Sequence, residues 1–299
     1  MDFSRLAEDL KKNGIEYAEN EPMSRHTSFR IGGPAAIMVF PRTADETAEA
    51  LRLAQGYDTL LFGNGSNLLA GDGRLEIAAI KTCRESEAEY LGDGKIKVPC
   101  SMLLSKAAAF ALKHSLAGLE FAAGIPGTLG GAVFMNAGAY GGEMKDIVLQ
   151  TEYLTKDLER RIISNEEHGF GYRKSVFSGG DGVVLFSVLQ LEKGDKNEIR
   201  EKMDLLAQKR RASQPLDLPS AGSTFKRPVG GYAAALIEQA GLKGVSVGGA
   251  MVSPKHSGFV VNMGGATCED VRRLMDIIVE KVYAFSGITL EPEVKFVGC

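Results

Sequence analysis

The stretch Ala122–Gly142, which reads AAGIPGTLGGAVFMNAGAYGG, holds a Gly or Ala at almost every second position and a single Pro. It resembles neither a core helix, nor an amphipathic strand, nor a disordered tail. Glycine permits positive φ and carries no Cβ, so consecutive amide N–H groups in such a stretch can converge on an anion. The stretch therefore predicts a backbone cradle for an anionic ligand, to which Thr128 and a helix beginning after it would add donors.

A second glycine-rich loop, GNGSNLL at Gly63–Leu69, follows a strand-like run and adds Ser66 and Asn67, whose side chains can donate hydrogen bonds to phosphate oxygens. It is not a Rossmann fingerprint, because Gly63 and Gly65 lack the third Gly and the long helix, and no GKS or GKT supports a P-loop. One such loop alone is more typical of a tight turn. Two in a nearly neutral chain favour a phosphate-bearing ligand, and a pyrophosphate has the charge and length to occupy both.

Composition excludes several classes of protein. The 299 residues are 44% hydrophobic, enough for about two domains, and the formal net charge of -3 gives no footprint for nucleic acid or an anionic membrane. No apolar run reaches the roughly 18 residues of a membrane span, and the first residues form an amphipathic helix rather than a secretory signal, so we expect a cytoplasmic protein. We expect reduced structural thiols and no metal site, because the cysteines and histidines are scattered: Cys83, Cys100, Cys268 and Cys299; His26, His114, His168 and His256.

Strand and helix signals alternate in the first half of the chain. A strand at Ala35–Pro41, a helix opened by a capping box from Thr43 to Glu46 and stopped at Gly56, and the strand TLLF lead into the GNGSNLL loop. This order predicts an α/β unit with its loop at the carboxyl end of a strand, where ligands of such sheets bind. Further elements are expected as strands at LEIAAIK and KIKVP and a helix from Ser101 through Ala117.

The second half begins as a mixed sheet. IVLQTEYLT and GVVLFSVLQLEKG are β-rich, and Asn197 is expected to cap the next helix, which has Ile199, Met203 and Leu206 on one face. From about Gln214 the pattern changes to a loop, a short helix at YAAALIEQAG, a strand-like GFVVNM and a long helix opened by Thr267. We therefore expect a domain boundary near Ala207.

Seven motifs occur in an order that resembles the UDP-N-acetylenolpyruvoylglucosamine reductases of bacterial peptidoglycan synthesis: SFRIGG, GNGSNLL, AGIPGTLGGAVFMNAGAYGGE, FGYRKSVF, SAGSTFKRP, HSGFVVN and LEPEV. The resemblance covers nearly the whole chain. It implies a mixed α+β fold, with a two-part FAD-binding domain of the vanillyl-alcohol-oxidase (PCMH) type at 1–80 and 81–206 and a C-terminal α/β substrate-binding domain at 207–299. Because the insert after YRKSVF is brief, the chain resembles the subgroup without an extra tyrosine-bearing loop.

The resemblance implies non-covalent FAD on the two glycine loops, with NADPH as the electron source. His26 stands beside TSFRIGG and is expected to be structural rather than a covalent flavin attachment. The expected cofactor-binding residues are Gly63, Asn64, Gly65, Ser66, Asn67, Leu68, Ile125, Pro126, Gly127, Thr128, Gly130, Gly131, Ala132, Asn136 and Gly138.

The implied reaction reduces an enolpyruvyl ether to a lactyl ether in cell-wall synthesis. Hydride reaches the vinyl carbon distant from the carboxylate, so the site needs a cation at the carboxylate and a proton donor on the opposite face. Arg173 matches the family's catalytic arginine and Ser223 its proton donor. Glu293 matches the third catalytic position, with Glu291 as the competitor. The expected substrate-binding residues are Tyr172, Arg210, Arg211, Lys226 and Arg227, although many relatives have Asn where Arg227 stands.

Two other functions share the glycine loops. A flavin-dependent alcohol or sugar oxidase of the same fold would use oxygen and would not need Arg173, Ser223 and Glu293 together. A nucleotide-sugar sensor would bind without turnover, and the presence of all three catalytic matches argues against it. We expect no nucleic-acid or membrane partner, and the sequence does not predict the oligomeric state.

Overall fold

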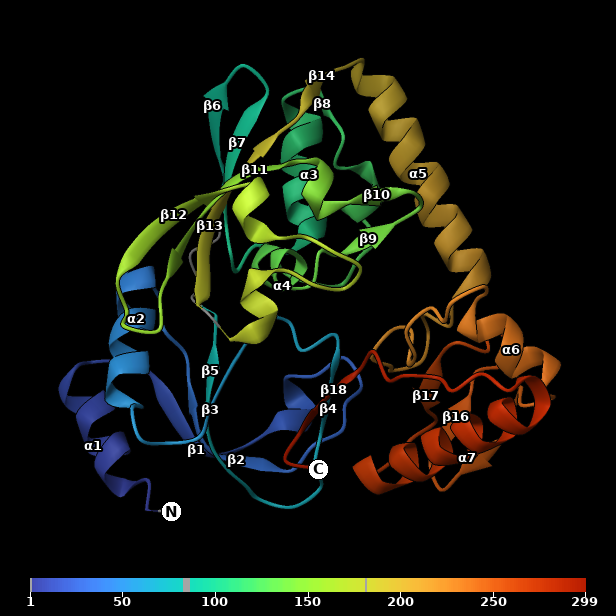
Figure 1. Ribbon diagram of the computed structural model, residues 1–299. Coiled ribbons are helices and arrows are strands. Elements are labelled where there is room, and N and C mark those ends of the chain that lie inside the picture. The colour runs from blue at the N-terminus through green and yellow to red at the C-terminus, as the bar shows by residue number, and fades with distance from the viewer. Residues whose placement is uncertain (1, 83–86, 181) are drawn as a thin grey trace. The chain divides into compact units, whose positions relative to one another are not determined.

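The computed structural model describes residues 2–82, 87–180 and 182–299 (Figure 1). The chain divides into two compact units, each assembled from three separate segments. Unit 1 consists of Met1–Glu19, Ile37–Asn64 and Ile77–Arg210, and unit 2 of Asn20–Ala36, Gly65–Glu76 and Arg211–Cys299. The three-domain division expected from the sequence stays a prediction.

The predicted strand–helix–strand order in the first half is confirmed. It comprises β2 (Pro34–Val39), α2 (Ala44–Leu53) and β3 (Thr59–Phe62), so the helix ends before the predicted stop at Gly56. These strands belong to a four-stranded sheet in the order β1-β2-β5-β3, in which β3 and β5 run parallel. The remaining elements of this part are α1 (Ser4–Lys12), β1 (Tyr17–Pro22) and β5 (Leu75–Lys81).

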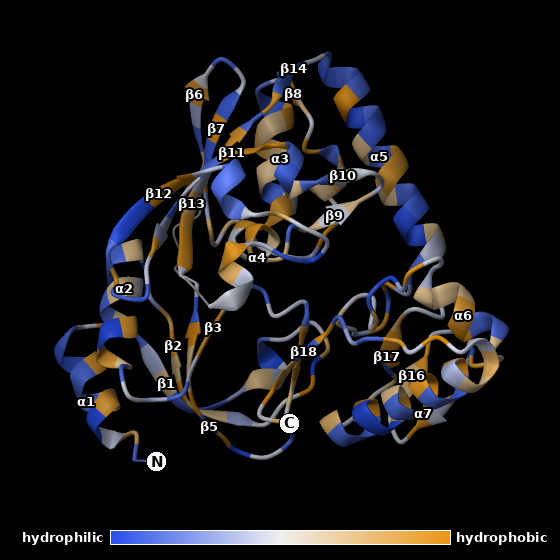
Figure 2. Cartoon of the chain, viewed as in Figure 1, coloured by the Kyte–Doolittle hydropathy of each residue, from blue (hydrophilic) through white to orange (hydrophobic). Residues whose placement is uncertain are grey.

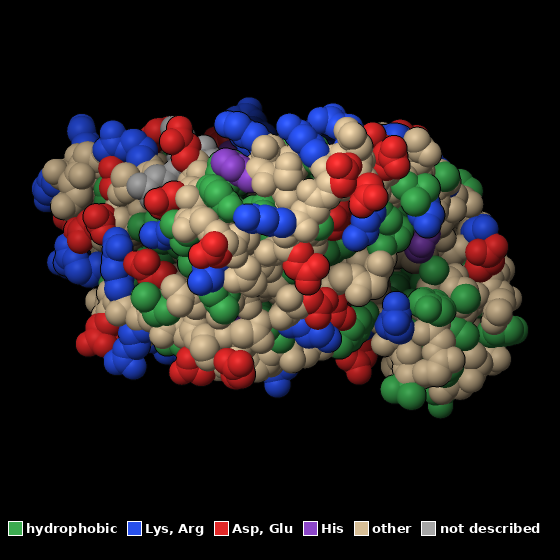
Figure 3. Space-filling view, turned by 90° about the horizontal axis from the view of Figure 1, so that it is seen from above, with side chains coloured by type: hydrophobic (Ala, Val, Ile, Leu, Met, Phe, Trp, Pro, Cys, Tyr) green, Lys and Arg blue, Asp and Glu red, His purple; other side chains and the backbone are tan. Residues whose placement is uncertain are grey.

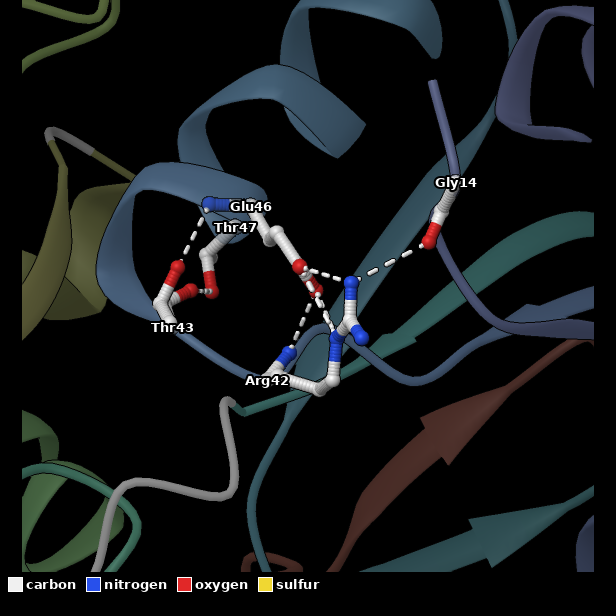
Figure 4. A network of polar contacts seen from close by, with 5 residues as sticks. All are labelled: Gly14, Arg42, Thr43, Glu46 and Thr47. Carbon is white, nitrogen blue, oxygen red and sulfur yellow. Dashed lines mark hydrogen bonds and ion pairs between the residues drawn. The ribbon is translucent and has the colours of Figure 1, made fainter. Parts of the chain in front are cut away.

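The start of α2 differs in one detail from the predicted capping box (Figure 4). The Thr43 hydroxyl accepts the Glu46 backbone N–H at 3.1 Å, as predicted. The Glu46 carboxylate, however, accepts the backbone N–H of Arg42 at 2.8 Å and also binds the Arg42 guanidinium. Arg42 in turn donates to the carbonyl of Gly14 at 3.3 Å. Arg42 thus takes the place of the Thr43 amide as the partner of the Glu46 carboxylate. The network fastens the start of α2 to the loop after α1.

The main core of unit 1 lies on an antiparallel sheet in the order β12-β11-β13-β7-β6. The buried side chains of α3 (Leu104–Lys113) and α4 (Leu129–Phe134) share one hydrophobic cluster with those of the sheet. In Figure 2, β13 is coloured mainly as hydrophobic and α5 mainly as hydrophilic. The strands are β6 (Glu89–Gly92), β7 (Lys95–Pro99), β11 (Val148–Leu154), β12 (Arg160–Ser164) and β13 (Val183–Gln190).

Two helix predictions in unit 1 need correction. The helix α3 is shorter at both ends than the predicted Ser101–Ala117: it begins only at Leu104, and after its last residue the chain enters a short strand at Leu116. The helix α5 (Lys196–Ser213) is capped by Asp195, whose carboxylate accepts the N–H groups of Asn197 and Glu198, and not by Asn197 itself. Short elements complete this part: β8 (Leu116–Ala117), η2 (Glu120–Ala122), β9 (Gly138–Ala139), β10 (Gly142–Glu143), η3 (Met144–Asp146), η4 (Glu166–His168), η5 (Val176–Gly179) and β14 (Glu192–Lys193).

Unit 2 has its own core, in which α7 (Cys268–Ser286) packs against the antiparallel sheet β15-β16-β17. Thr267 caps α7 as predicted, and its hydroxyl accepts the N–H of Asp270 at 3.0 Å. Val271, Leu274, Ile278 and Val282 of α7 are fully buried, and each contributes about 1.5–3 kcal/mol. The other elements are η1 (Met23–Arg25), β4 (Leu68–Ala70), α6 (Ala233–Gln239), β15 (Ser246–Val247), β16 (Ala250–Val252), β17 (Val260–Asn262) and β18 (Lys295–Val297), and β18 pairs parallel to β4.

The described cysteines are free thiols. Cys100 is buried in the core of unit 1, while the Cys268 and Cys299 sulfurs of unit 2 lie 2.7 Å apart; Cys83 lies outside the described residues. Within residues 2–82, 87–180 and 182–299, no three His, Cys, Asp or Glu side chains are grouped as metal ligands. None of the helices described there is long and apolar enough to cross a membrane. Figure 3 shows basic and acidic side chains interspersed on the face in view, in keeping with the small net charge.

Candidate active site

The first two residues of the GNGSNLL loop, Gly63 and Asn64, lie beside the second predicted glycine loop within unit 1. The Asn64 side chain donates to the carbonyl of Pro126 at 2.6 Å, which joins the start of the GNGSNLL loop to the other loop. A Cβ added to Gly63 would stand 2.3 Å from the Thr128 hydroxyl oxygen, so only glycine fits there. We call Gly63, Asn64, Pro126 and Thr128 the glycine cradle.

The Thr128 hydroxyl is the buried polar group of the glycine cradle. Its oxygen is buried and finds no hydrogen-bond partner among the described residues. A buried hydroxyl left unpaired costs about 1–3 kcal/mol, so such groups in native proteins call for an explanation. A ligand oxygen in the cradle would supply the missing partner, which fits a phosphate-bearing cofactor such as FAD.

The start of α4 differs from the phosphate-binding helix terminus expected after Thr128. The first two amides of α4 are already used, since Leu129 N–H donates to Met102 and Gly130 N–H donates to Cys100, both at 2.9 Å. A Cβ on Gly130 would also lie 2.9 Å from that of Cys100. Close packing therefore accounts for Gly130, whereas Gly131 is exposed on the Thr128 side.

Three other residues that were predicted to bind FAD stabilise the second loop through backbone contacts or burial. Gly127 accepts the N–H of Leu104 at 3.0 Å, and Ile125 donates to Ala122 at 3.0 Å. Ala132 is buried within α4. These contacts hold the loop in shape, and any contact of the three residues with FAD stays a prediction.

The remaining part of GNGSNLL belongs to unit 2. Gly65 has φ +60°, and a Cβ there would stand 2.2 Å from the carbonyl of His26, whose ring contacts Glu21 at 3.0 Å. The Asn67 side chain donates to the carbonyl of Glu293 at 3.1 Å. Leu68 begins β4, and Ser66 is half-buried. Asn67 thus fixes the backbone at a predicted catalytic residue, a role that the sequence did not reveal.

Asn136 and Gly138 follow α4 in unit 1. The Asn136 side chain is buried, and its amide donates to Glu143 at 2.9 Å and to the carbonyl of Gly171 at 3.1 Å. Gly138 lies in β9, where a Cβ would meet the Glu143 side chain at 2.7 Å. Both candidates therefore have partners within the protein, and their predicted contacts with FAD stay untested.

Arg173 lies in a tight turn of unit 1. Gly171 and Lys174 exchange backbone hydrogen bonds of 3.0 and 3.2 Å, with Tyr172 and Arg173 between them. Arg173 has φ +53°, an uncommon conformation for a residue other than glycine, and such conformations concentrate at functional sites. Its guanidinium lies 5.4 Å from the centre of the half-exposed Tyr172 ring. We call Gly171–Lys174 the arginine turn.

Ser223 and Glu293 are brought close together within unit 2. The residue after Ser223, Thr224, accepts the backbone N–H of Glu293 at 2.8 Å and donates its own N–H to Gly258. The Thr224 hydroxyl accepts the N–H of Val260 at 3.0 Å. Ser223 is exposed, whereas Glu293 is only 9% exposed. We call Ser223 and Glu293 the serine–glutamate pair.

The backbone pairing around Thr224 and Lys226 places the two competing glutamates in different environments. Lys226 donates its backbone N–H to Glu291 at 2.8 Å and its ammonium to the Glu291 carboxylate at 3.0 Å. The Glu291 side chain is 72% exposed, in contrast to the buried Glu293. Neither residue is in a strand, because β18 begins only at Lys295. Glu291 therefore serves a surface ion pair.

The remaining basic candidates belong to different units, and each is described within its own unit. Arg210 of unit 1 lies against the glycine stretch, where a Cβ on Gly124 would meet its Cδ at 3.1 Å, and burial lowers the pKa of Arg210. In unit 2, the Arg227 guanidinium lies 4.6 Å from the centre of the Tyr232 ring. Arg211 is exposed, and its carbonyl accepts the Lys255 ammonium at 2.6 Å. The substrate contacts of these residues remain predictions.

Glu143 lies near the arginine turn, and the sequence motifs predicted no role for it. The hydrogen bond from Lys145 at 2.9 Å, then that from Asn136, holds the pKa of Glu143 below its usual value, and the charge of Arg173 adds to the effect. Glu143 stands at the end of the motif AGIPGTLGGAVFMNAGAYGGE, where only its place in the motif marked it.

Two family models match the chain. Residues 35–160 match the FAD binding domain, and residues 214–297 match the C-terminal domain of UDP-N-acetylenolpyruvoylglucosamine reductase. These matches confirm the expected order of a FAD-binding region followed by a C-terminal domain.

Known proteins resemble the chain over nearly its full length. A UDP-N-acetylenolpyruvoylglucosamine reductase from Caldanaerobacter subterraneus subsp. tengcongensis is 47% identical over 97% of this chain and 96% of its own. The crystal structure of such a reductase from Thermus caldophilus gives a TM-score of 0.81 at 34% identity, covering 94% of this chain and 98% of that chain. A glucooligosaccharide oxidase from Acremonium strictum shares the fold alone, with a TM-score of 0.51 at 13% identity over 97% of this chain and 60% of its own.

Proposed function

This chain belongs to the UDP-N-acetylenolpyruvoylglucosamine reductase family, and on that basis we propose that it reduces UDP-N-acetylenolpyruvoylglucosamine to UDP-N-acetylmuramate, with FAD as cofactor and NADPH as electron source. The activity is a step in the synthesis of peptidoglycan precursors. The observation that carries the proposal is the glycine cradle, in which two loops meet at the unpaired Thr128 hydroxyl.

The cradle residues would hold FAD without a covalent bond. The Thr128 hydroxyl, for which Gly63 leaves room, would donate to a cofactor oxygen. Asn64 keeps the two loops together through Pro126. When bound, FAD would supply hydride, taken from NADPH, to the vinyl carbon distant from the substrate carboxylate.

Arg173 would bind the substrate carboxylate. Negative charge develops there as the vinyl carbon is reduced, and a guanidinium placed in advance stabilises this charge through two parallel hydrogen bonds. The tight turn supports this role, because it presents Arg173 in a conformation that the surrounding structure must maintain.

Ser223 would give the proton that the carbon beside the carboxylate takes up. An exposed hydroxyl can regain its proton from water, which a weak acid such as serine requires. Glu293 is buried and held by Thr224 and Asn67, so it suits a fixed electrostatic role beside Ser223. Glu291 suits this role less, since its carboxylate is exposed and paired with Lys226.

The nucleotide part of the substrate carries its own pyrophosphate. Arg210, Arg211, Lys226, Arg227 and Tyr172 are the residues that we propose to contact the substrate. Arg210 is the best supported of the cations, because it is partly buried against Gly124 and remains charged at neutral pH.

Anaerobic spectroscopy tests the proposal. The purified protein should show a flavin absorbance that bleaches on adding NADPH and returns on adding UDP-N-acetylenolpyruvoylglucosamine. Bleaching by an alcohol or sugar in place of NADPH, followed by return of the absorbance with oxygen but not with the enolpyruvyl compound, would favour an oxidase. Absence of flavin, together with no binding of added FAD, would overturn the cradle and favour a nucleotide-sugar sensor.

A further inference from the structure

The arginine turn is hydrogen-bonded to residues at and just after the carboxyl end of α4. On one side, the amide of Asn136 donates to the carbonyl of Gly171 at 3.1 Å. On the other, the Ser175 hydroxyl donates to the carbonyl of Phe134 at 2.7 Å. The turn therefore takes its position from α4, the helix that begins directly after the cradle residue Thr128.

The orientation of the Asn136 amide is fixed by its partners. Its nitrogen donates to the Glu143 carboxylate and to the Gly171 carbonyl, while its oxygen accepts the backbone N–H of Lys145 at 2.9 Å. A flipped amide would place its oxygen against two acceptors and its nitrogen against a donor. Asn136 is 2% exposed, so water does not offer substitutes for these contacts.

The turn needs this support because of its backbone. Arg173 has φ +53°, and a non-glycine residue keeps such a conformation only where neighbouring contacts hold it. Gly171, whose carbonyl Asn136 holds, exchanges two hydrogen bonds with Lys174 across the turn. A displacement of Gly171 would therefore move both central residues, Tyr172 and Arg173.

The charges around the amide strengthen the arrangement. The Glu143 carboxylate is held by the Lys145 ammonium at 2.9 Å and by the Asn136 amide, so it stays ionised near Arg173. The amide thus links a fixed carboxylate to the backbone of the turn.

We propose that Asn136 is a positioning residue, which places Arg173 for the substrate carboxylate by holding the carbonyl of Gly171. The inference rests on the proposed role of Arg173. It gives Asn136 a function separate from the expected contact with FAD, and it makes α4 a common support for the cofactor cradle and the substrate arginine.

The test compares two ligands that differ in the carboxylate. Asn136→Gly removes the amide but tolerates the positive φ of +44° at this position. We expect Asn136→Gly to weaken binding of UDP-N-acetylenolpyruvoylglucosamine about tenfold, as loss of one charge-assisted hydrogen bond does. Binding of UDP-N-acetylglucosamine, which lacks the enolpyruvyl carboxylate, and the FAD content should stay unchanged. Perturbation of the flavin absorbance measures both affinities.

A double-mutant cycle identifies the residue through which Asn136 acts. Arg173→Lys keeps a cation, so ligand binding remains measurable, but it removes the two-pronged geometry. If Asn136 acts through Arg173, adding Asn136→Gly to Arg173→Lys should weaken binding less than it does in the wild type. Gln190→Ala is the matched control, because the Gln190 amide also donates to two backbone carbonyls in unit 1, those of Asp93 and Leu191, and not to the turn.

The outcomes separate the inference from the proposed function. Normal affinity of Asn136→Gly for both ligands, with Arg173→Lys impaired, would overturn the positioning role. A parallel loss of FAD and of both ligands would also overturn it and would assign Asn136 to the cofactor or to the fold. If Arg173→Lys itself binds the enolpyruvyl ligand normally, the proposed role of Arg173 fails first.

Discussion

The glycine cradle of unit 1 places one buried hydroxyl against a glycine that leaves room for it, whereas the serine–glutamate pair of unit 2 consists of side chains placed by backbone pairing. In the cradle, Gly63 is required because Thr128 occupies the space of a Cβ. In the pair, Thr224 accepts the N–H of Glu293, and this bond holds an exposed Ser223 near a buried carboxylate. The cradle suits a cofactor that stays bound, and the pair suits proton transfer to a substrate that comes and goes.

Loss of the serine hydroxyl should have the largest effect. Ser223→Ala removes the proposed proton donor, so we expect reoxidation of the flavin by the enolpyruvyl substrate to slow by about 10² to 10⁴-fold. FAD content and bleaching by NADPH should be unchanged, because the cradle lies in unit 1. Stopped-flow absorbance measures each half-reaction. Ser246→Ala, another exposed serine of unit 2, is the control, and a normal rate for Ser223→Ala would refute the assignment.

The two glutamates should respond very differently to loss of charge. Glu293→Gln should lower kcat about a hundredfold, the usual cost of removing one electrostatic group from a catalytic site. Glu291→Gln should change kcat less than about twofold, because an exposed ion pair such as that with Lys226 contributes at most about 1 kcal/mol. Steady-state kinetics of both variants provide the comparison, and the reverse ranking would favour Glu291 as the catalytic residue.

Replacing the unpaired hydroxyl of the cradle should separate cofactor binding from stability. Thr128→Val keeps the shape but removes the hydroxyl, so FAD affinity should fall about tenfold while the apoprotein is at least as stable as the wild type. Isothermal titration with FAD and thermal melts of the apoprotein give the two quantities.

A threonine with satisfied bonds supplies the control for that variant. The Thr151 hydroxyl contacts His168 and Ser187, both at 2.8 Å. Thr151→Val should therefore lower the melting temperature without weakening FAD. Equal loss of stability in the two valine variants would show that Thr128 has a structural partner.

Acid should lower the stability of the fold through one buried histidine of unit 1. His168 is fully buried, and burial lowers its pKa from the ordinary 6.5. Below about pH 6.5 the unfolded chain takes up a proton that the folded protein refuses, so this histidine destabilises the fold by at most ~1.4 kcal/mol per pH unit. Above that pH the histidine is neutral in both states, so its ionisation does not change the free energy of unfolding. His168→Gln should flatten the acid side of a plot of melting temperature against pH, and an unchanged slope would contradict the assignment.

The smallest effect concerns the thiols. The hydrogen bond from Cys268 lowers the pKa of Cys299 to about 7, whereas Cys100 is buried in the core of unit 1. Alkylation of Cys299 by iodoacetamide should therefore increase as the pH rises through 7, while Cys100 stays unlabelled in the folded protein. Peptide mass spectrometry distinguishes the sites. Cys268→Ser should alter this pH dependence, and identical profiles would exclude an influence of Cys268.

Much of the fold could be predicted from the sequence, because local signals decide it. The strands β5 and β7 have the predicted bounds, since alternating or continuous apolar runs end at clear breaks. Helix ends were less predictable. Glu46 turned to Arg42 rather than completing the capping box, and Asp195 capped α5 in place of Asn197, because neighbouring polar side chains compete for the same amides.

The candidate site could be predicted as a set of motifs but not as an arrangement. Nothing local indicates that Asn64 would reach Pro126, or that the Asn67 amide would hold the carbonyl of Glu293, 226 positions away. Glu293 was chosen over Glu291 because it matches the family motif, and its burial, which depends on the pairing around Thr224, is a feature that the motif did not indicate. These features arise from tertiary contacts, which periodicity and turn signals in the sequence do not predict.

The parallel pairing of β18 with β4 has a consequence for how the protein is made. A ribosome produces Leu68–Ala70 early and must extend the chain beyond Val297 before the two strands can meet. Closing so long a loop slows folding, and until then the backbone of Leu68–Ala70 lacks this partner. Unit 2 therefore completes its fold only after Val297 has emerged, and the proposed catalytic residue Glu293 reaches its place late in synthesis.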